Sequence, residues 1–303
     1  MHTIQLNSLK YFILILTVLL TACGERYEQN ASLEYINEIE EWHNKRIENL
    51  KKENGWLNLV GLHWLNEGEN RFGSSKENDI IFPEKAPKFI GSFILKDSIV
   101  NAEILPNVNV LLNDSVISKI VMKDDLSGEP TILKLGSLRW FIIKRGNKFG
   151  VRIRDVEAKL VKEFRGIERF PVNIDWRVEA KFVPFDSPKK VMIPNVLGIE
   201  EEETVTGKLI FNLKGKDYSL FPIESGEKLF IIFADETNGE TTYGAGRFLY
   251  ADKPDSTGKV TLDLNKAYNP PCVFTNYATC PLPPPQNRLS IKITAGEKNF
   301  GDH

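Results

Sequence analysis

The sequence LDLNKAYNPPCVFTNYATCPLPPPQNRLSIKITAGEK runs from Leu262 to Lys298 and combines a strand pattern, two cysteines, a proline run and closely spaced polar residues. Apolar and polar residues alternate over positions 260–265, which predicts a half-buried β-strand at its start. No other stretch of the chain is as dense in groups that can bind or react. We therefore expect any functional site to lie in this segment or on the strands that lead to it.

Two predicted strands lead to this segment. Residues 229–234 are continuously apolar, which predicts a strand buried on both faces, and Asn238-Gly239 is a strong hairpin signal. The return strand is expected over residues 241–250, where two glycines indicate a bulge or a close approach by another segment or a ligand. A symmetric register about the next turn places Arg247 opposite Asp263, which predicts a charge-assisted ion pair.

The whole chain is predicted to be mainly β, in an α+β arrangement. Residues 32–70 contain an amphipathic helix that begins at Ser32, followed by a Trp-rich connector that carries His63. Short apolar runs broken by Gly, Asn and Asp predict an antiparallel sandwich over residues 71–146 and a second antiparallel β domain or barrel over residues 147–303. Within the second domain, the acidic run at 200–203 is expected in a solvated loop.

The runs FGSSKENDI, IGSF, VNVLLND and TILKLGSLRWFII of the first β region follow an order that resembles a forkhead-associated domain. That family binds phosphothreonine through an arginine and a serine on loops. Here Gly91-Ser92-Phe93 stands where the family's Ser-x-x-His segment would be. The resemblance therefore implies a sandwich fold and not phosphopeptide binding.

Residues 1–22 have the pattern of a secretory signal peptide. Lys10 precedes the apolar run YFILILTVLL, which is shorter than the roughly 20 residues of a membrane-spanning helix. The run ends in Leu20-Thr21-Ala22-Cys23, which resembles the lipobox of bacterial lipoproteins. That resemblance implies acylation of Cys23 and a polar tether over residues 23–31, so that the protein is held to a membrane of the bacterial cell envelope.

The composition indicates which partners to expect. The formal net charge is −2, and no basic stripe or basic-aromatic block is present, so nucleic acid is not an expected partner. The expected partners are the membrane, through the N-terminal lipid, and a small polar molecule. The sequence points to no particular cofactor.

Cys272 and Cys280 are the thiols that remain once Cys23 carries lipid. In an oxidising compartment they could form a disulfide, which would stabilise the fold by about 2–3 kcal/mol in the chain-entropy model. One alternative is a nucleophilic cysteine, but no histidine lies near in the sequence. We do not expect a metal site, because the spacing is too long for a Cys-x-x-Cys knuckle.

The segments GWLNLVGLHWL, FRGIERFPVNIDWRVEAKF, TTYGAGRFL and the quoted C-terminal sequence together resemble the bacterial domain-of-unknown-function family 1684 (DUF1684). The resemblance extends from about Trp42 to Lys298 and implies a fold but no activity. Many members of that family look cytosolic, where a shared disulfide would not persist. With this resemblance, a disulfide between Cys272 and Cys280 and a pair of free thiols are equally expected.

Three functional hypotheses follow. In the first, the chain is a lipid-anchored protein that binds a small polar ligand. In the second, it is a hydrolase with Asp263 or Glu297 as general base, Arg247 as electrostatic stabiliser and His63 as a further base. In the third, the polar residues only lock the C-terminal segment across the sheet. The further ligand-binding residues of the first hypothesis are Asp235, Thr237, Tyr243, Asn265, Asn269, Asn287 and Arg288.

Overall fold

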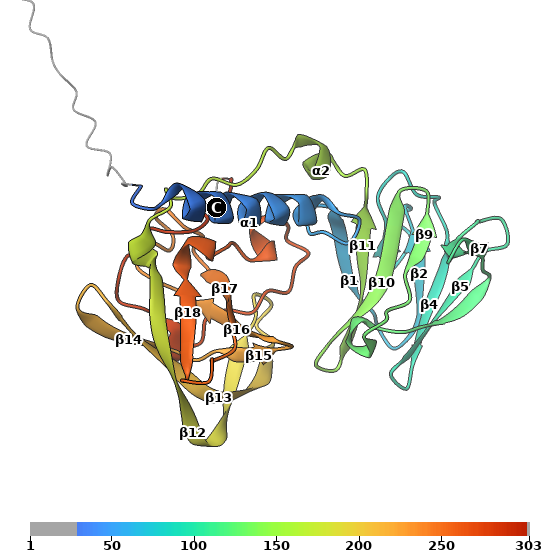
Figure 1. Ribbon diagram of the computed structural model, residues 1–303. Helices are drawn as coiled ribbons and strands as arrows, with labels where there is room; N and C mark the ends of the chain where they lie inside the picture. Colours follow the sequence, from blue (N-terminus) through green and yellow to red (C-terminus); the bar gives the residue numbers. More distant parts are fainter. Residues whose placement is uncertain (1–28, 302–303) are drawn as a thin grey trace, which may run out of the picture.

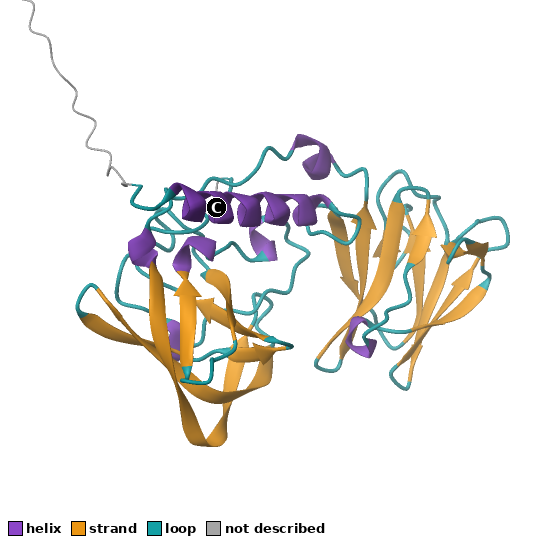
Figure 2. Ribbon diagram, viewed as in Figure 1, coloured by secondary structure: helices purple, strands orange, loops and turns teal. Residues whose placement is uncertain are grey.

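The structure is a computed structural model that describes residues 29–301. Two β units lie side by side, and one long helix crosses the C-terminal unit and ends next to the N-terminal unit (Figure 1). Strands dominate both units (Figure 2), so the predicted mainly β architecture with an N-terminal helix is confirmed. The predicted signal peptide, the predicted lipidation site Cys23 and most of the predicted tether lie outside the described residues.

Helix α1 (Leu33–Lys51) begins where the sequence predicts. Ser32 is extended, and its hydroxyl accepts a 3.2 Å hydrogen bond from the Tyr35 N–H, which satisfies one of the free donors of the first turn. The helix ends at Lys51 because Lys52 turns into an extended conformation. No helix among residues 29–301 is both long and apolar enough to span a bilayer. The buried residues of α1 are Tyr35, Ile39, His43 and Leu50.

The N-terminal unit is the predicted sandwich of two sheets. In spatial order, one sheet contains β3 (Ile80–Ile81), β2 (Gly68–Gly73), β4 (Gly91–Lys96), β5 (Ile99–Ile104) and β8 (Lys119–Met122). The other contains β1 (Leu59–Trp64), β11 (Lys148–Asp155), β10 (Leu138–Arg145), β9 (Leu133–Leu135), β6 (Leu111–Leu112) and β7 (Ser115–Val116). Phe72 and Phe93 stack at 4.2 Å on the first sheet and pack with Trp140 of the second, so the two sheets share one apolar core.

The boundary of this unit differs from the prediction. A boundary between residues 146 and 147 would separate β10 from β11, but these strands pair along their whole length. Val151 and Ile153 face the sandwich core, as their alternation predicts. Because β1 pairs with the other edge of β11, the N-terminal unit ends only after Asp155. Helix α2 (Lys159–Glu163) then lies in the connection to the second unit.

The C-terminal unit is built from two further sheets. In spatial order, these are β14 (Lys216–Leu220), β13 (Glu200–Leu213), β12 (Arg177–Pro194) and β18 (Lys259–Asp263), and β15 (Ile223–Ser225), β16 (Lys228–Phe233) and β17 (Arg247–Asp252). Leu209, Leu249 and Leu262 share one apolar core. After β18 the C-terminal segment winds across the unit with little regular structure. The short 3₁₀ helices of the chain are η1 (Asp125–Ser127), η2 (Ile174–Trp176), η3 (Leu264–Lys266), η4 (Pro271–Val273) and η5 (Pro285–Asn287).

Two predictions for this unit are wrong. The acidic run at 200–203 is not a loop but the start of β13, where it pairs with the end of β12, and Lys190 lies 3.1 Å from Glu202. The return strand after β16 begins only at Arg247, because residues 235–246 form a turn held by side chains. In this turn the Asp235 carboxylate accepts hydrogen bonds from the backbone and hydroxyl of Thr237.

The close approach predicted at the glycines is confirmed at Gly246. Its φ is +99°, a conformation that favours glycine. A Cβ atom at this position would lie 2.6 Å from the Phe233 carbonyl oxygen and 2.5 Å from the Pro283 side chain. The segment that approaches is therefore the proline run of the C-terminal segment.

Candidate ligand-binding site

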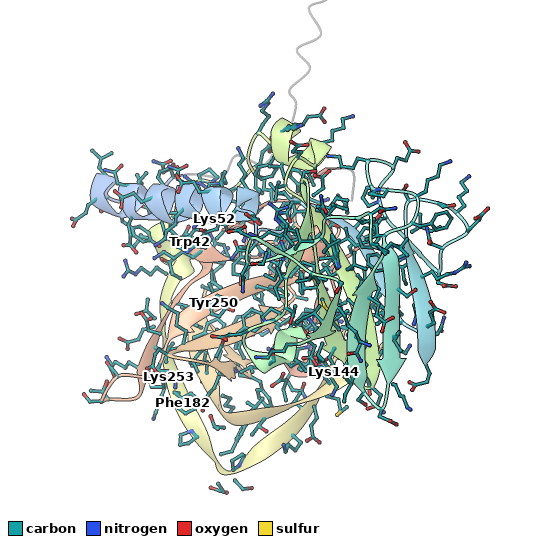
Figure 3. All side chains as sticks on the ribbon, turned by 90° about the vertical axis from the view of Figure 1, so that its right-hand side faces the viewer. Trp42, Lys52, Lys144, Phe182, Tyr250 and Lys253 are labelled. Atoms are coloured by element: carbon teal, nitrogen blue, oxygen red, sulfur yellow. The ribbon has the colours of Figure 1, made fainter. Side chains whose placement is uncertain are left out.

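An open pocket of about 560 Å³ lies between helix α1 and the sheet that contains β16 and β17. Figure 3 shows Trp42 and Lys52 at α1 and Tyr250 on the sheet beneath it. The remaining walls come from residues 52–56, which follow α1, and from residues 268–274 of the C-terminal segment. The aromatic lining residues are Trp42, Trp56, Phe230, Phe248, Tyr250, Tyr268 and Phe274. A concave surface that is rich in aromatic rings and carries several polar groups is the usual character of a small-molecule site.

The rings of the sheet and the C-terminal segment pack against one another. Tyr250 and Tyr268 are stacked, with ring centroids 6.3 Å apart and an interplanar angle of 14°. Phe248 meets Tyr268 edge to face at 5.8 Å, and Phe230 meets Phe248 in the same way at 5.0 Å. Burial raises the pKa of Tyr268, and the neighbouring Tyr250 adds to the rise, so the phenol stays protonated at neutral pH. This wall therefore presents ring faces whose positions are fixed by their neighbours.

Arg46 is a cation held in the pocket wall by a buried carboxylate. Its guanidinium carbon lies 4.3 Å from the centroid of the Tyr268 ring. Its Nε and Nη2 atoms both donate to Glu297, and Nη2 also donates to the Asn269 carbonyl oxygen at 2.8 Å. Glu297 is 1% exposed and accepts a further 2.7 Å hydrogen bond from the Asn269 N–H. This bidentate pair fixes both the position and the plane of the guanidinium group.

The charged side chains in the described lining of the pocket are all positive. Among the described lining residues, the charged side chains are Arg46 and Lys52, and none is a carboxylate. Lys52 is exposed at the end of α1, whereas Glu297 offsets part of the charge of Arg46. Asn269 is buried in the wall, where its Nδ2 donates to the Lys298 carbonyl oxygen at 2.7 Å. The polar part of the pocket therefore suits an anionic group more than a cationic one.

Arg247 belongs to a separate buried ion pair. Its Nη2 donates to Asp235 at 2.7 Å, both side chains are 0% exposed, and the guanidinium group also donates to the carbonyl oxygens of Ile293 and Ala295. The predicted pairing of Arg247 with Asp263 is wrong. It required β17 to pair with β18, but β17 pairs with β16 and β18 pairs with β12. The pair that forms ties the C-terminal segment to the turn after β16.

Asp263 connects the start of α1 to the C-terminal unit. Its Oδ1 accepts hydrogen bonds from the Tyr35 hydroxyl at 2.7 Å and from the Asn265 N–H at 3.2 Å, so it also caps η3. Burial raises the pKa of Tyr35, and the hydrogen bond to Asp263 adds to this rise. Asn265 in turn donates to the Asn173 carbonyl oxygen at 2.9 Å. These groups are engaged with one another and lie outside the pocket lining.

Asn287 ties the C-terminal segment to two neighbouring segments. Its side chain donates to the carbonyl oxygens of Phe221 and Ile232 and accepts from the Phe221 N–H. The adjacent Arg288 is exposed, and its backbone forms a bridge with Ala234. The structure therefore does not bring these two predicted ligand-binding residues to the pocket. Thr237, also predicted, is buried and hydrogen-bonded within its own turn.

The residues of the hydrolase hypothesis are not assembled into one cluster. His63 lies on β1 of the N-terminal unit, opposite Val151. Burial lowers the pKa of His63, and this effect outweighs a hydrogen bond with the Ile81 backbone that raises it. The histidine beside Glu297 is instead His43, whose Nδ1 lies 4.0 Å from the carboxylate. Burial lowers the pKa of His43, which favours its neutral form at pH 7. Asp263, Arg247 and Glu297 each have a different partner, which is Tyr35, Asp235 and Arg46 respectively.

Among the predicted site residues, Asn269 lines the pocket and Glu297 lies directly behind it. Tyr243 and the two cysteines form a separate cluster, in which both thiols are free. No group of three or more potential metal ligands occurs among residues 29–301. Sequence reasoning missed Trp42, Arg46, Trp56, Tyr250 and Tyr268. One signal could have found two of them, because Trp42 and Arg46 are one helical turn apart on a predicted helix.

The C-terminal unit matches a known family model, described as "Protein of unknown function (DUF1684)", over residues 162–298. A search of curated proteins gives no match. Among solved structures, the chain is similar to an uncharacterised protein of Haloarcula marismortui, with 28% identity, 48% of this chain and 83% of that chain covered, and a TM-score of 0.40.

Forkhead-associated domains are also similar in structure. A domain from a study of phosphothreonine-dependent interactions shares 13% identity, over 31% of this chain and 92% of that chain, with a TM-score of 0.22. The domain of FhaA shares 12% identity, over 31% and 97% of the two chains, with the same TM-score. These TM-scores are low. The family resemblance therefore rests on the family model, which residues 162–298 match.

Proposed function

We propose that the protein binds a small molecule with an aromatic ring and a carboxylate group in the pocket beneath α1. The observation that carries this proposal is the position of Arg46, which lies over the Tyr268 ring and is held there by the buried Glu297. A ring of the ligand would pack against Tyr250 and Tyr268, whose faces are already aligned. Its carboxylate would lie near Arg46 and Lys52, the cations of the lining.

A cationic aromatic ligand is the main competitor, because aromatic cages also bind quaternary ammonium groups. Here the cation–π position over Tyr268 is already taken by Arg46. Lys52 would repel a second cation, and no lining side chain among the described residues could neutralise it. These charges favour a carboxylate over an ammonium group.

Calorimetric titration of the full chain with phenylacetate, indole-3-acetate and 4-hydroxybenzoate tests this proposal. The uncharged amide of each acid provides the comparison. We expect at least one acid to bind, and its amide to bind about tenfold more weakly, a difference of about 1.4 kcal/mol. Lys52→Glu and Tyr250→Ala should each weaken binding of the acid by at least a similar factor, because the first reverses a charge at the pocket and the second removes a ring face from it.

Two variants outside the pocket serve as matched controls. Lys253→Glu makes the same charge change at an exposed residue outside the lining, labelled in Figure 3. Tyr277→Ala removes an exposed tyrosine that is also outside the lining. Both should bind the acid as the wild type does. The proposal is wrong if acid and amide bind equally, if none of the acids binds, or if the controls lose as much affinity as the pocket variants.

We also propose that an acyl chain on Cys23 holds this pocket at the surface of a bacterial envelope membrane. The support is the sequence Leu20-Thr21-Ala22-Cys23 after a short apolar run. Expression in a bacterial host with labelled palmitate should place label in the wild-type chain and none in Cys23→Ser. Equal labelling of both chains, or the absence of label from the wild type, would exclude the anchor.

A further inference from the structure

Cys272 and Cys280 lie next to each other in the C-terminal segment. The backbone N–H of Cys272 donates to the Cys280 sulfur at 3.1 Å, and the two thiols are hydrogen-bonded to each other. Cys272 is half-buried, in η4, whereas Cys280 is 4% exposed. The segment between the two cysteines is held at both ends. Cys272 lies in η4, and the Val196 N–H donates a 3.0 Å hydrogen bond to the Cys280 carbonyl oxygen. The two sulfur atoms are therefore placed to react with each other.

The surroundings of the two thiols are asymmetric. The Cys280 thiol and the Tyr243 hydroxyl both donate to the Cys272 sulfur. These hydrogen bonds lower the pKa of Cys272, and their effect outweighs that of burial, which raises it. Burial and the hydrogen bond to Cys272 both raise the pKa of Cys280. This is the arrangement of an activated attacking thiol that is the more exposed of the two, with a second thiol that is buried and held protonated.

A buried cation also faces this cluster. Arg152 is 3% exposed on β11, and its Nη2 is 3.4 Å from the Thr279 hydroxyl, next to Cys280. Its Nε has no hydrogen-bond partner among the described residues, and it forms no salt bridge among them. A buried guanidinium without a carboxylate partner favours negative charge nearby. It would stabilise the Cys280 thiolate when that group forms, since the two interact electrostatically.

We propose that Cys272 and Cys280 form a reversible dithiol–disulfide couple, in which Cys272 attacks a low-molecular-weight disulfide and Cys280 resolves the product. Cys272 lies beside the pocket and not in its lining, because its sequence neighbours Pro271 and Phe274 line the pocket and Cys272 does not. The structure as described holds the reduced form, with both thiols free. The oxidant is the small disulfide itself, and the inference does not depend on the carboxylate proposed as ligand above.

The reaction has two exchange steps. In the first, the Cys272 thiolate forms a bond to one sulfur of the disulfide, the sulfur–sulfur bond breaks, and one thiolate leaves. In the second, Cys280 loses its proton to solvent and attacks the Cys272 sulfur, which releases the other half of the disulfide as a thiolate. The protein loses two electrons and the disulfide gains them.

The test uses the full chain with Cys23→Ser, which leaves Cys272 and Cys280 as the only cysteines. Reduced protein is mixed with oxidised glutathione, and the products are followed by intact mass spectrometry and by released glutathione. We expect the parent chain to form an internal disulfide with two glutathione molecules released per chain. Cys280→Ser should instead accumulate a mixed disulfide on Cys272 and release one glutathione.

The order of attack is tested by rates. Cys272→Ser should react at least about tenfold more slowly than Cys280→Ser, since the remaining thiol is buried and has a raised pKa. Tyr243→Phe removes one donor to Cys272 and should slow the first step without changing the final product. The order of reactivity can also be measured with both cysteines present. We expect iodoacetamide to modify Cys272 before Cys280 in the folded parent chain, as followed by peptide mapping.

Several results would overturn the proposal. One is a parent chain that remains unmodified or carries two glutathione adducts without an internal bond. Another is equal reactivity of the two serine variants, together with equal alkylation of the two cysteines in the parent chain. The alkylation measurement decides the order of attack even where a serine variant fails to fold. A loss of carboxylate binding in the calorimetric assay would leave these outcomes unchanged.

Discussion

Replacement of Arg247 by methionine is expected to lower the free energy of unfolding by about 3–5 kcal/mol, because it leaves a buried carboxylate without its partner. The Asp235 side chain is 0% exposed and accepts a 2.7 Å hydrogen bond from the Arg247 guanidinium. The same substitution removes hydrogen bonds to the Ile293 and Ala295 carbonyl oxygens, which would be left buried. Urea unfolding of the full chain, followed by circular dichroism, measures this change.

Lys228→Met provides the matched control. Lys228 and Asp252 also form an ion pair, at 2.8 Å between β16 and β17, but these side chains are 55% and 86% exposed. Removal of this exposed pair should cost less than about 1 kcal/mol. The double variant with Asp235→Asn and Arg247→Met should lose less free energy of unfolding than the sum of the losses in the two single variants, because both substitutions remove the same ion pair. A loss below about 1 kcal/mol for Arg247→Met would contradict the structural role given to this pair.

Arg46→Met is the second change with a large expected effect, a loss of about 3 kcal/mol in the free energy of unfolding. Glu297 is 1% exposed, and without Arg46 its described hydrogen-bond donor is the Asn269 N–H. Arg46→Lys should recover only part of the loss, because an ammonium group cannot make the two parallel hydrogen bonds of a guanidinium. The same urea experiment applies, with the wild-type chain as the reference.

Arg169→Met is the matched control for this second change. Arg169 is also paired with a carboxylate at α1, but its partner Glu40 is 47% exposed. Water can solvate Glu40 when the arginine is removed, so we expect a loss of about 1 kcal/mol or less. If Arg169→Met and Arg46→Met destabilise the chain equally, burial of Glu297 does not determine the cost. The contribution of Arg46 to ligand binding is measured separately, in the calorimetric assay.

Elements with strong local patterns could be predicted from the sequence. Ser32 followed by helical apolar spacing predicts the start of α1, and the alternation from Phe149 to Asp155 predicts β11. The hairpin of β13 and β14 follows from the glycine-containing turn Lys214-Gly215. In these cases the signal and the structure it specifies lie within a few residues of each other.

The partners of the buried charges could not be predicted in this way. A hairpin register places Arg247 opposite Asp263, but β18 pairs with β12, which is far away in the sequence. Local propensity also gives the wrong prediction for the acidic start of β13. There the cross-strand pairing with β12 determines the structure, although a run of acidic residues by itself favours a loop. Both errors come from strand pairing, which the global fold determines.

The candidate site could be predicted only in part for the same reason. The quoted C-terminal segment supplies Tyr268 and Asn269, as expected of its density of polar groups. The other walls come from α1 and the residues that follow it up to Trp56, and from β16 and β17, which no local pattern joins to that segment. Most of the polar residues singled out in the segment are instead buried contacts that hold the chain in place, and this placement makes the pocket.

The most direct test of the proposed site is a crystal structure of the full chain with the tightest-binding acid of the calorimetric panel. We predict that the ring of the ligand packs on Tyr250 or Tyr268 and that its carboxylate lies within hydrogen-bonding distance of Arg46 or Lys52. A ligand bound elsewhere, such as at Arg247 and Asp235, with the pocket beneath α1 empty, would contradict this account.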